Sequence, residues 1–424
     1  MNAHIAAWRE LVAVSLLSVA VACGGPPTAG EDGPAADAAA VDTRQGGTTA
    51  WVRQLGGRGY EFVQDLATSP RGTTLLTIVG DTGPMGVPVD LGLVRLRPDR
   101  SVAWSRQFHG ITDQTTWLSI GADRSGAVVV SFHFDCQVGR TCVDLGRGQA
   151  AGSVLARFDR NGRLEWQRAI QADMSVSEVA VDPQGNAAVA VFRGDAGTAS
   201  GTHVVAYDAR GNRKFDVAVP FPVFDPYPVV LAYDEAGNLA VGDWGSLTIA
   251  SLDPRRGLQR WMTSLGGAGA RGGIRAIGTT AKGTVVAVAG FTGGPIVWGS
   301  SRSASSSGTF VAVAERDGRP RLGWEVGRSV GAAAVDPAGR LALLTAAAGE
   351  ECSTRLERWD LTGKRLWARP LSTCTGYVFT NALGIDPRAH DVQAAGAMGG
   401  TVDFGRGPIA SRGDLDGFVL DVRP

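Results

Sequence analysis

The chain has 424 residues, with 41 basic and 41 acidic side chains, so its formal net charge at neutral pH is zero. A balanced charge gives no electrostatic reason to expect nucleic acid or an acidic lipid surface as a partner. Hydrophobic residues make up 44% of the chain, which is enough for a globular fold and argues against disorder throughout.

An apolar run of 12 residues, Leu11–Ala22, follows Arg9. It is too short to cross a bilayer, which needs about 20 residues, but it suits the core of a secretory signal peptide. The run ends in AVAC, whose last residue is Cys23. This ending resembles the bacterial lipobox, in which small residues precede a cysteine that becomes the lipidated N-terminus. Ala20 stands where that motif usually has leucine, and Glu10 weakens the basic region, so ordinary secretory cleavage nearby remains the alternative.

The resemblance implies that residues 1–22 are removed and that Cys23 carries acyl chains such as palmitate. Each buried CH₂ of such a chain contributes about 0.8 kcal/mol, which would hold the protein in the cell envelope. Gly24 beside Cys23 favours the outer membrane, with the protein facing the periplasm or the cell surface. Residues 23–49 are rich in Gly, Pro, Ala and Asp. We expect them to form a flexible tether to a domain at residues 50–424, because they bury too little apolar surface to offset their ordering entropy.

Four further cysteines, Cys136, Cys142, Cys352 and Cys374, make an even set. An even number suits the oxidising compartment that the signal peptide implies. Of the three possible pairings we expect the two local disulfides, Cys136–Cys142 and Cys352–Cys374, with free buried thiols as the alternative. The sequence predicts no zinc site, because it has no CxxC motif or His–Cys cluster.

From residue 50 onward, one pattern recurs: an apolar strand, a turn with Asp and Gly, and a strand centred on an aromatic residue. Val154–Ile170, VLARFDRNGRLEWQRAI, is a complete copy. The aromatic positions are Trp51, Trp104, Trp166, Phe215, Trp261, Trp324 and Trp367. A second pattern, with Asp-x-x-Gly between β-rich runs as in Val179–Phe192, falls between successive copies of the first and also occurs seven times. Asp and Gly are typical of hairpin turns, so each unit is predicted to contain two hairpins.

Units of about 40–60 residues with four strands are typical of propeller blades. The two ends of the chain also complement each other, since Asp416–Pro424 holds the first half of the first pattern and Thr49–Gly57 the second half. The sequence therefore predicts an all-β, seven-bladed β-propeller of four-stranded antiparallel blades, closed by pairing of the N- and C-terminal strands. Closure would leave no long open edge, whereas an open solenoid would need polar caps. We expect the Ser-rich segment Trp298–Phe310 to be an exposed loop.

The turns VDPQGN and YDEAGN resemble those of propeller repeats in exported bacterial proteins and, more loosely, the quinoprotein-type repeat. This resemblance indicates a fold but not an activity, because propellers host many functions. The repeated Asp residues are expected to cap turns, since one D-x-x-G offers too few oxygens for calcium. Gly267–Gly272 fits G-x-G-x-x-G, but a β-rich run follows, so a loop is expected there and not a dinucleotide site. No catalytic residue, metal site or cofactor is predicted, and the five histidines are isolated in sequence.

The sequence thus favours a monomeric, non-catalytic propeller lipoprotein that binds or scaffolds an unidentified protein or glycan. One alternative is a quinoprotein-like or polysaccharide-cleaving propeller enzyme, which a convergent pocket of carboxylates and arginines at the central mouth would favour. Another is an outer-membrane assembly factor, which the quinoprotein-type resemblance implies. Trp117, Trp244, Trp298 and Trp359 lie outside the repeated aromatic position, and they would stack on a sugar only if their rings are exposed.

Overall fold

The computed structural model describes residues 47–56, 59–80, 89–111, 118–134, 143–146, 148–150, 152–170, 175–193, 201–219, 221, 229–346, 354–371 and 376–424. These residues belong to one compact unit, Asp42–Pro424. Strands and turns make up all of the described ranges, and no helix in them is long and apolar enough to cross a membrane. The five cysteines, Cys23, Cys136, Cys142, Cys352 and Cys374, lie outside the described residues, so lipidation and both disulfides remain predictions.

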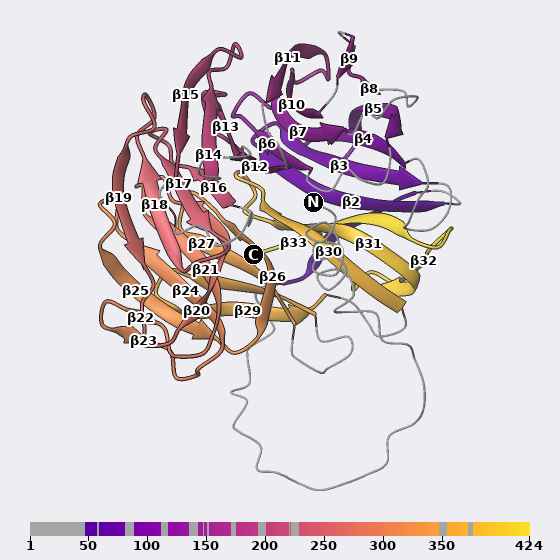
Figure 1. The fold of residues 1–424 in the computed structure, drawn as a ribbon. Coiled ribbons are helices and arrows are strands. Elements are labelled where there is room, and N and C mark those ends of the chain that lie inside the picture. The colour runs from indigo at the N-terminus through magenta and orange to yellow at the C-terminus, as the bar shows by residue number, and fades with distance from the viewer. Residues whose placement is uncertain are drawn as a thin grey trace, which may run out of the picture. The chain divides into compact units, whose positions relative to one another are not determined.

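Seven four-stranded antiparallel sheets surround a common axis as the blades of a propeller (Figure 1). Within each blade the strands are named a to d from the axis outward. Blade 1 contains β2 (Tyr60–Ser69), β3 (Gly72–Gly80), β4 (Val89–Leu96) and β5 (Val102–Ile111). Blade 2 contains β6 (Ser119–Ala122), β7 (Val128–Phe134), β10 (Gly152–Phe158) and β11 (Leu164–Ile170). Blade 3 contains β12 (Ser175–Val181), β13 (Ala187–Arg193), β14 (Gly201–Tyr207) and β15 (Arg213–Ala218).

The remaining blades repeat this order. Blade 4 contains β16 (Val229–Tyr233), β17 (Leu239–Asp243), β18 (Thr248–Leu252) and β19 (Gln259–Ser264). Blade 5 contains β20 (Arg271–Thr279), β21 (Val285–Thr292), β24 (Gly308–Ala314) and β25 (Pro320–Val326). Blade 6 contains β26 (Ser329–Val335), β27 (Arg340–Ala346), β28 (Arg355–Asp360) and β29 (Arg365–Pro370). Blade 7 contains β30 (Gly376–Ile385), β31 (Val392–Asp403), β33 (Asp416–Val422) and, outermost, β1 (Thr49–Leu55).

The two ends of the chain close the ring within blade 7. Strand β1 pairs antiparallel with β33, with Trp51 opposite Asp421 and Gln54 opposite Phe418. The predicted number of blades, their four-stranded composition and this closure are all confirmed. The first and last strands therefore lie in one sheet. Blade 7 thus has four main strands, as the other six blades do, and the short strand β32 is an addition to β31.

The two kinds of hairpin turn lie on one face of the ring. Because neighbouring strands run antiparallel, the a–b and c–d turns lie on one face, here called the turn face, and the b–c and d–a connections lie on the other, the loop face. The Asp182 carboxylate accepts backbone hydrogen bonds from Gln184 and Asn186 at 2.9 and 2.8 Å, and Gly185 has a φ of 89°. The repeated Asp residues are thus turn caps, as predicted.

All seven repeated aromatic residues lie on the outermost strands, where they join neighbouring blades. The Trp166 ring lies over Gly211 in the c–d turn of blade 3, and its indole N–H donates to the Ala209 carbonyl at 3.0 Å. Trp261 repeats the contact at Gly318 and donates to the Arg316 carbonyl at 2.9 Å. A Cβ on Gly318 would lie 2.6 Å from that indole. The turn glycine and the aromatic residue are therefore two halves of one contact between blades.

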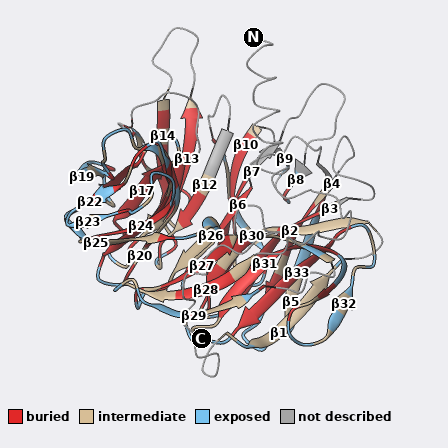
Figure 2. Ribbon diagram, turned by 90° about the horizontal axis from the view of Figure 1, so that it is seen from below, coloured by how far each residue is buried: buried red, intermediate tan, exposed pale blue. Residues whose placement is uncertain are grey.

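The core runs through the middle strands, which are buried on both faces (Figure 2). Every residue of β17 and β18, for example, is buried, which explains their continuous apolar sequences. Most of the Ser-rich segment is exposed, as expected, but part of it is a hairpin and not a plain loop. β22 (Val297–Trp298) and β23 (Ser301–Arg302) form a hairpin in which Trp298 is 2% exposed and donates its indole N–H to the Val313 carbonyl at 3.0 Å.

Candidate functional site

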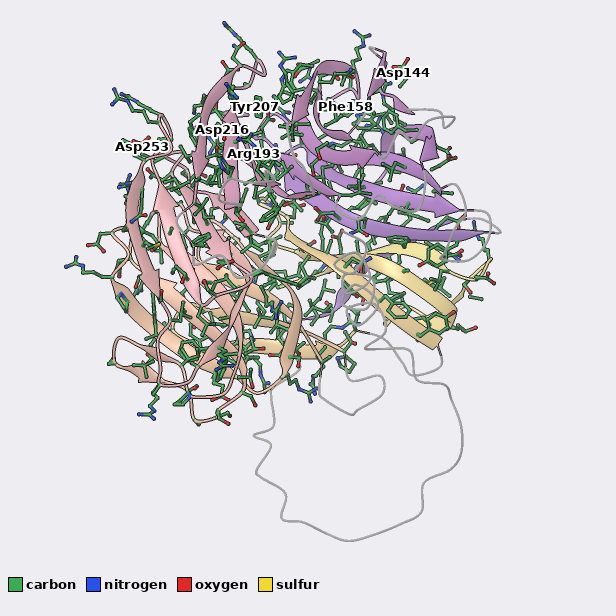
Figure 3. All side chains as sticks on the ribbon, viewed as in Figure 1. Asp144, Phe158, Arg193, Tyr207, Asp216 and Asp253 are labelled. Carbon is green, nitrogen blue, oxygen red and sulfur yellow. The ribbon has the colours of Figure 1, made fainter. Side chains whose placement is uncertain are left out.

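One histidine lies in a cluster of charged side chains on blade 3. His203, Arg193 and Asp216 meet on blade 3 (Figure 3), where Arg193 binds Asp216 at 3.0 and 2.9 Å and His203 Nδ1 lies 3.1 Å from it. Burial alone would raise the pKa of Asp216, but the hydrogen bonds from Arg193 and His203 outweigh it and lower that pKa. Because these groups satisfy one another, we interpret them as a structural ion cluster.

The off-anchor tryptophans within the described ranges are largely engaged by the protein. Trp359 stacks on Trp324 with ring centroids 6.2 Å apart. The guanidinium of Arg275 lies 4.0 Å over the Trp244 ring, a cation–π contact at the loop-face side of blades 4 and 5. Trp298 is buried, and Trp117 lies outside the described residues. The described rings therefore do not form the exposed stacking surface that a sugar would need.

Two carboxylates on the innermost strands have strongly perturbed pKa values. Burial raises the pKa of Asp65 to about 6. Burial and, secondly, the charge of Asp65 raise the pKa of Glu178 to about 8. Such shifts are typical of active sites but also of structural networks. The hydrogen bonds of Asp65 and Glu178 show which of these two roles, catalytic or structural, fits them.

Both carboxylates join one blade to the next. Asp65 Oδ2 accepts the Ile120 N–H at 3.0 Å, and Glu178 Oε2 accepts the Leu231 N–H at 3.2 Å. Ser119, at the same repeat position of blade 2, accepts the Val179 N–H at 3.2 Å. In blades 1, 2 and 3, a polar side chain on the inner strand thus binds the inner strand of the next blade. This residue stands four positions before the turn cap in each of the three blades. Val230, Ala276, Ala332 and Ala382 fill this position in the other blades. We therefore interpret Asp65 and Glu178 as residues that hold the inner strands of neighbouring blades together.

A small cleft of about 10 Å³, enough for about one water molecule, lies between blades 4 and 5 and is lined in part by Asp234, Ser251 and Arg316. At the position of Ser251, blade 2 has Arg157, whose guanidinium binds the turn carboxylate of Asp123 at 2.5 Å. The cleft therefore exists because Ser251 is much shorter than the arginine at the same position of blade 2. Asp234 is already satisfied by its own turn, accepting from the Asn238 backbone at 2.8 Å and its side chain at 2.7 Å. The cleft therefore does not expose an unpaired carboxylate.

An aromatic group lies at the loop-face end of the inner strands of blades 7 and 1. It consists of Tyr60 and Phe62 on β2 and Tyr377 and Phe379 on β30, and is here called the aromatic group. The Tyr60 and Phe62 rings pack edge to face with centroids 5.5 Å apart, and those of Tyr377 and Phe379 do so at 5.7 Å. Burial and, secondly, the neighbouring Tyr377 raise the pKa of Tyr60. The two pairs therefore lie together at the junction of the blades.

Tyr377 is the most exposed member of the aromatic group, at 50%. Its hydroxyl donates to the Asp414 carbonyl at 3.3 Å, and its ring lies across Gly399 of β31, where a Cβ would meet it at 2.2 Å. Tyr60 forms a β-bridge with Leu415 in the connection before β33. Backbone contacts thus fix both tyrosines, and rigid, half-wet rings of this kind are suited to binding a partner.

The sequence carried a signal for this group that the repeat analysis missed. Tyr-x-Phe occurs at Tyr60–Phe62 and again at Tyr377–Phe379, in each case nine residues before the first residue of the a–b turn, Ser69 or Asp386. Aligning the units on their turns would have brought the two motifs together. Their adjacency, however, depends on ring closure, since blades 1 and 7 lie at opposite ends of the chain.

Comparison with known proteins supports the fold. No protein-family model matches the sequence, and no curated protein matches it. The chain is similar to the β-propeller domain of Cps50 (Swd1) from Myceliophteria thermophila, with 12% identity over 89% of this chain and 99% of that one and a TM-score of 0.50. It is also similar to the β-propeller domain of the Trilobed protease from Pyrococcus furiosus, with 10% identity over 82% and 97% of the two chains and a TM-score of 0.50.

The Pyrococcus domain has an open velcro topology, whereas β1 and β33 pair in this chain. BamB from Moraxella catarrhalis is a third similar structure, with 12% identity over 87% of this chain and 98% of that one and a TM-score of 0.41. The similarity to the Cps50 and Trilobed protease domains supports a β-propeller and, at these identities, does not extend to activity or partners. The chain is a seven-bladed β-propeller.

Proposed function

We propose that this chain is a non-catalytic propeller module that binds a protein or glycan partner on its loop face, acting as a monomer in the cell envelope. The observation that carries the proposal is the aromatic group, whose rings are held by the scaffold while Tyr377 stays half exposed. Large aromatic side chains that lose little entropy on binding are typical of the residues that dominate interfaces.

The loop face is also where the blades differ most. Each a–b and c–d turn is short and capped by its own polar residues, whereas the b–c connection of blade 5 carries the β22–β23 hairpin. In blade 7 that connection carries β32 (Pro408–Ala410), which pairs with β31. Variable connections on a rigid scaffold are the usual place for recognition. The aromatic group lies beside the blade 7 connection, through the Tyr60–Leu415 bridge.

The test is to place a photo-crosslinking amino acid at Tyr377 in the native host and to compare it with one at Asn161. Asn161 is an exposed position in the c–d turn of blade 2, on the opposite face. A discrete adduct at Tyr377 alone is expected, and its sensitivity to protease or glycosidase shows whether the partner is a protein or a glycan. No adduct at Tyr377, or equal adducts at both positions, would refute the proposed site.

We further infer that the propeller is anchored through a lipid on Cys23 and that residues 23–49 tether it to the membrane. The support is the lipobox-like sequence before Cys23 and the low apolar content that follows it. Metabolic labelling with an alkyne fatty acid should mark the wild-type chain and not Cys23→Ser. Labelling that survives the substitution, or a wild-type chain that is released without lipid, would contradict the anchor. The outer membrane is the expected location, to be checked by fractionation.

A further inference from the structure

The outer edge of blades 4, 5 and 6 on the turn face carries a surface that the aromatic group does not explain. It comprises the c–d turns and the adjoining parts of the outer strands, residues 253–262, 315–321 and 360–366, here called the rim. Figure 1 shows β19, β25 and β29 on the outside of these three blades. The blades are consecutive, so the three segments form one arc.

The rim has a positive charge that the neutral whole chain conceals. Its three segments contain eight basic and four acidic residues. Arg319 pairs with Asp317 at 2.8 Å and Arg321 with Glu315 at 3.7 Å. The remaining cations are more available. Within the rim, the exposed arginines that form no salt bridge with any residue that the structure describes are Arg255, Arg256, Arg260 and Arg316, of which Arg256 lies near the turn carboxylate of Asp253.

Exposed apolar side chains lie among these arginines. Leu258 is 58% exposed, Met262 43% and Leu366 41%. Within the described residues the other large apolar side chains with comparable exposure are Val297 and Tyr377. The rim therefore holds three of the five. Basic residues with interspersed leucine and methionine are the composition of surfaces that rest in a lipid interface.

The polypeptide also enters the propeller at this edge. Gly47, the first described residue, packs on the Trp367 ring of β29 in the way that a c–d turn glycine does in other blades. Its carbonyl accepts a hydrogen bond from Arg369 at 3.2 Å, and its N–H donates to the Arg423 carbonyl at 3.0 Å. The first described residue of the chain therefore lies next to blade 6, at one end of the rim.

We propose that the rim docks on the headgroups of anionic phospholipids, with Leu258, Met262 and Leu366 entering the interface and the free arginines contacting phosphate. Charge complementarity favours this partner, because the arginines attract its phosphate groups. A small anion in solution would also bind the arginines, but it would leave the neighbouring apolar side chains exposed to water, whereas a lipid interface buries them. The loop face would then point away from the membrane, toward the partner. This inference goes beyond partner binding and does not require lipid on Cys23.

The test uses the chain from residue 24 onward without its signal peptide and with Cys23 absent, so that no acyl chain contributes. All seven blades lie within Thr49–Val422, so this chain contains the whole ring. Its sedimentation is measured with vesicles of phosphatidylcholine containing phosphatidylglycerol, and with phosphatidylcholine alone. Binding is expected to the anionic vesicles only and to weaken with added salt.

Two rim variants and one matched control sharpen the result. Arg255→Ser/Arg256→Ser/Arg260→Ser should weaken binding about ten-fold or more, since each cation near an anionic surface contributes. Leu258→Ser/Met262→Ser should weaken it at unchanged charge. The control, Arg160→Ser/Arg163→Ser, removes exposed arginines from the equivalent turn of blade 2, which lies outside the rim. Unfolding curves verify that each variant is folded.

The proposal is sustained if both rim variants lose binding and the control keeps it. It is overturned if the wild-type chain ignores anionic vesicles, or if control and rim variants lose binding equally, which would indicate diffuse electrostatics. These outcomes do not depend on the loop-face partner, because the crosslinking test at Tyr377 uses the opposite face.

Discussion

At the scale of single residues, the polar side chains of the inner strands show how position determines role. Asp65 and Glu178 occur in apolar strands with no motif around them, so no local pattern distinguishes them from other strand residues. Burial raises the pKa of both carboxyls, and the charge of Asp65 adds to the rise at Glu178. The turn caps, by contrast, act within five residues of chain, and their role followed directly from Asp-x-x-Gly.

Glu178→Gln should remove a pH dependence from stability. The pKa of Glu178 rises from its usual 4.5 to about 8 on folding, so the folded chain binds the proton more tightly than the unfolded chain. The free energy of unfolding therefore falls as pH rises from about 4.5 to 8 and is level above that. Glutamine keeps an oxygen for the Leu231 N–H but does not ionise. We expect equal stability near pH 4.5 and a variant about 5 kcal/mol more stable near pH 9.

Urea unfolding of both proteins at several pH values measures this difference. Glu235→Gln is the control, because Glu235 is a surface residue paired with Arg124, and exposed pairs contribute about 0–1 kcal/mol. A wild-type chain whose stability does not change between pH 5 and 9 would show that Glu178 ionises normally.

At the scale of structural elements, the hairpin turns and the aromatic strands were both predictable, but their contact was not. Periodicity identified Trp261 and the turn glycine Gly318 as separate repeat features 57 residues apart. Only the arrangement of neighbouring blades places one on the other. In blade 1, Arg100 holds the glycine position at a φ of 69°, and the missing glycine gave no hint of the ion cluster that replaces it.

Gly318→Ala should destabilise the junction of blades 4 and 5. Gly318 has a φ of 85°, and a Cβ there would meet the Trp261 ring at 2.6 Å. The left-handed backbone alone costs about 1–2 kcal/mol with a side chain, and the clash adds to it. Gly407→Ala is the matched control, since Gly407 has a φ of 99° with open space around its Cβ.

The double-mutant cycle with Trp261→Ala separates the two contributions. We expect Gly318→Ala to cost more than Gly407→Ala in thermal or urea unfolding, and most of the excess to vanish once the indole is gone. Equal costs in the two glycine variants would mean that the indole yields without penalty and that the contact is not a determinant of blade packing.

At the scale of the whole molecule, closure depends on more than strand pairing. The side chain of Arg100, in the c–d turn of blade 1, reaches blade 7 and pairs with Asp386 at 3.4 Å, Asp391 at 3.7 Å and also with Asp421. Burial raises the pKa of Asp421 to about 6, although Arg100 opposes the rise. Complementary chain ends predicted where the ring closes, but the charge that stabilises the closure comes from a turn about 50 residues after β1.

Arg100→Ala should therefore open the ring at blade 7 before it unfolds the other blades. The variant leaves three carboxylates without the cation that pairs with all of them, although Arg423 and His390 still act on Asp391, and the loss of such a partner in a buried setting costs about 3–5 kcal/mol. The cost should be smaller at pH 5, where Asp421 takes up a proton, and larger at pH 8, where it is charged.

Hydrogen exchange of β1 and β33 is the measurement, with Arg97→Ala as the control. Arg97 is exposed, and its side chain donates hydrogen bonds to Ser101 and Val102 of its own hairpin. We expect faster exchange in β1 and β33 only, with a larger effect at pH 8 than at pH 5. This result would show that the ion cluster and the strand pairing close the propeller together. Exchange that rises evenly in all seven blades would mean instead that the ring has no separate closing step.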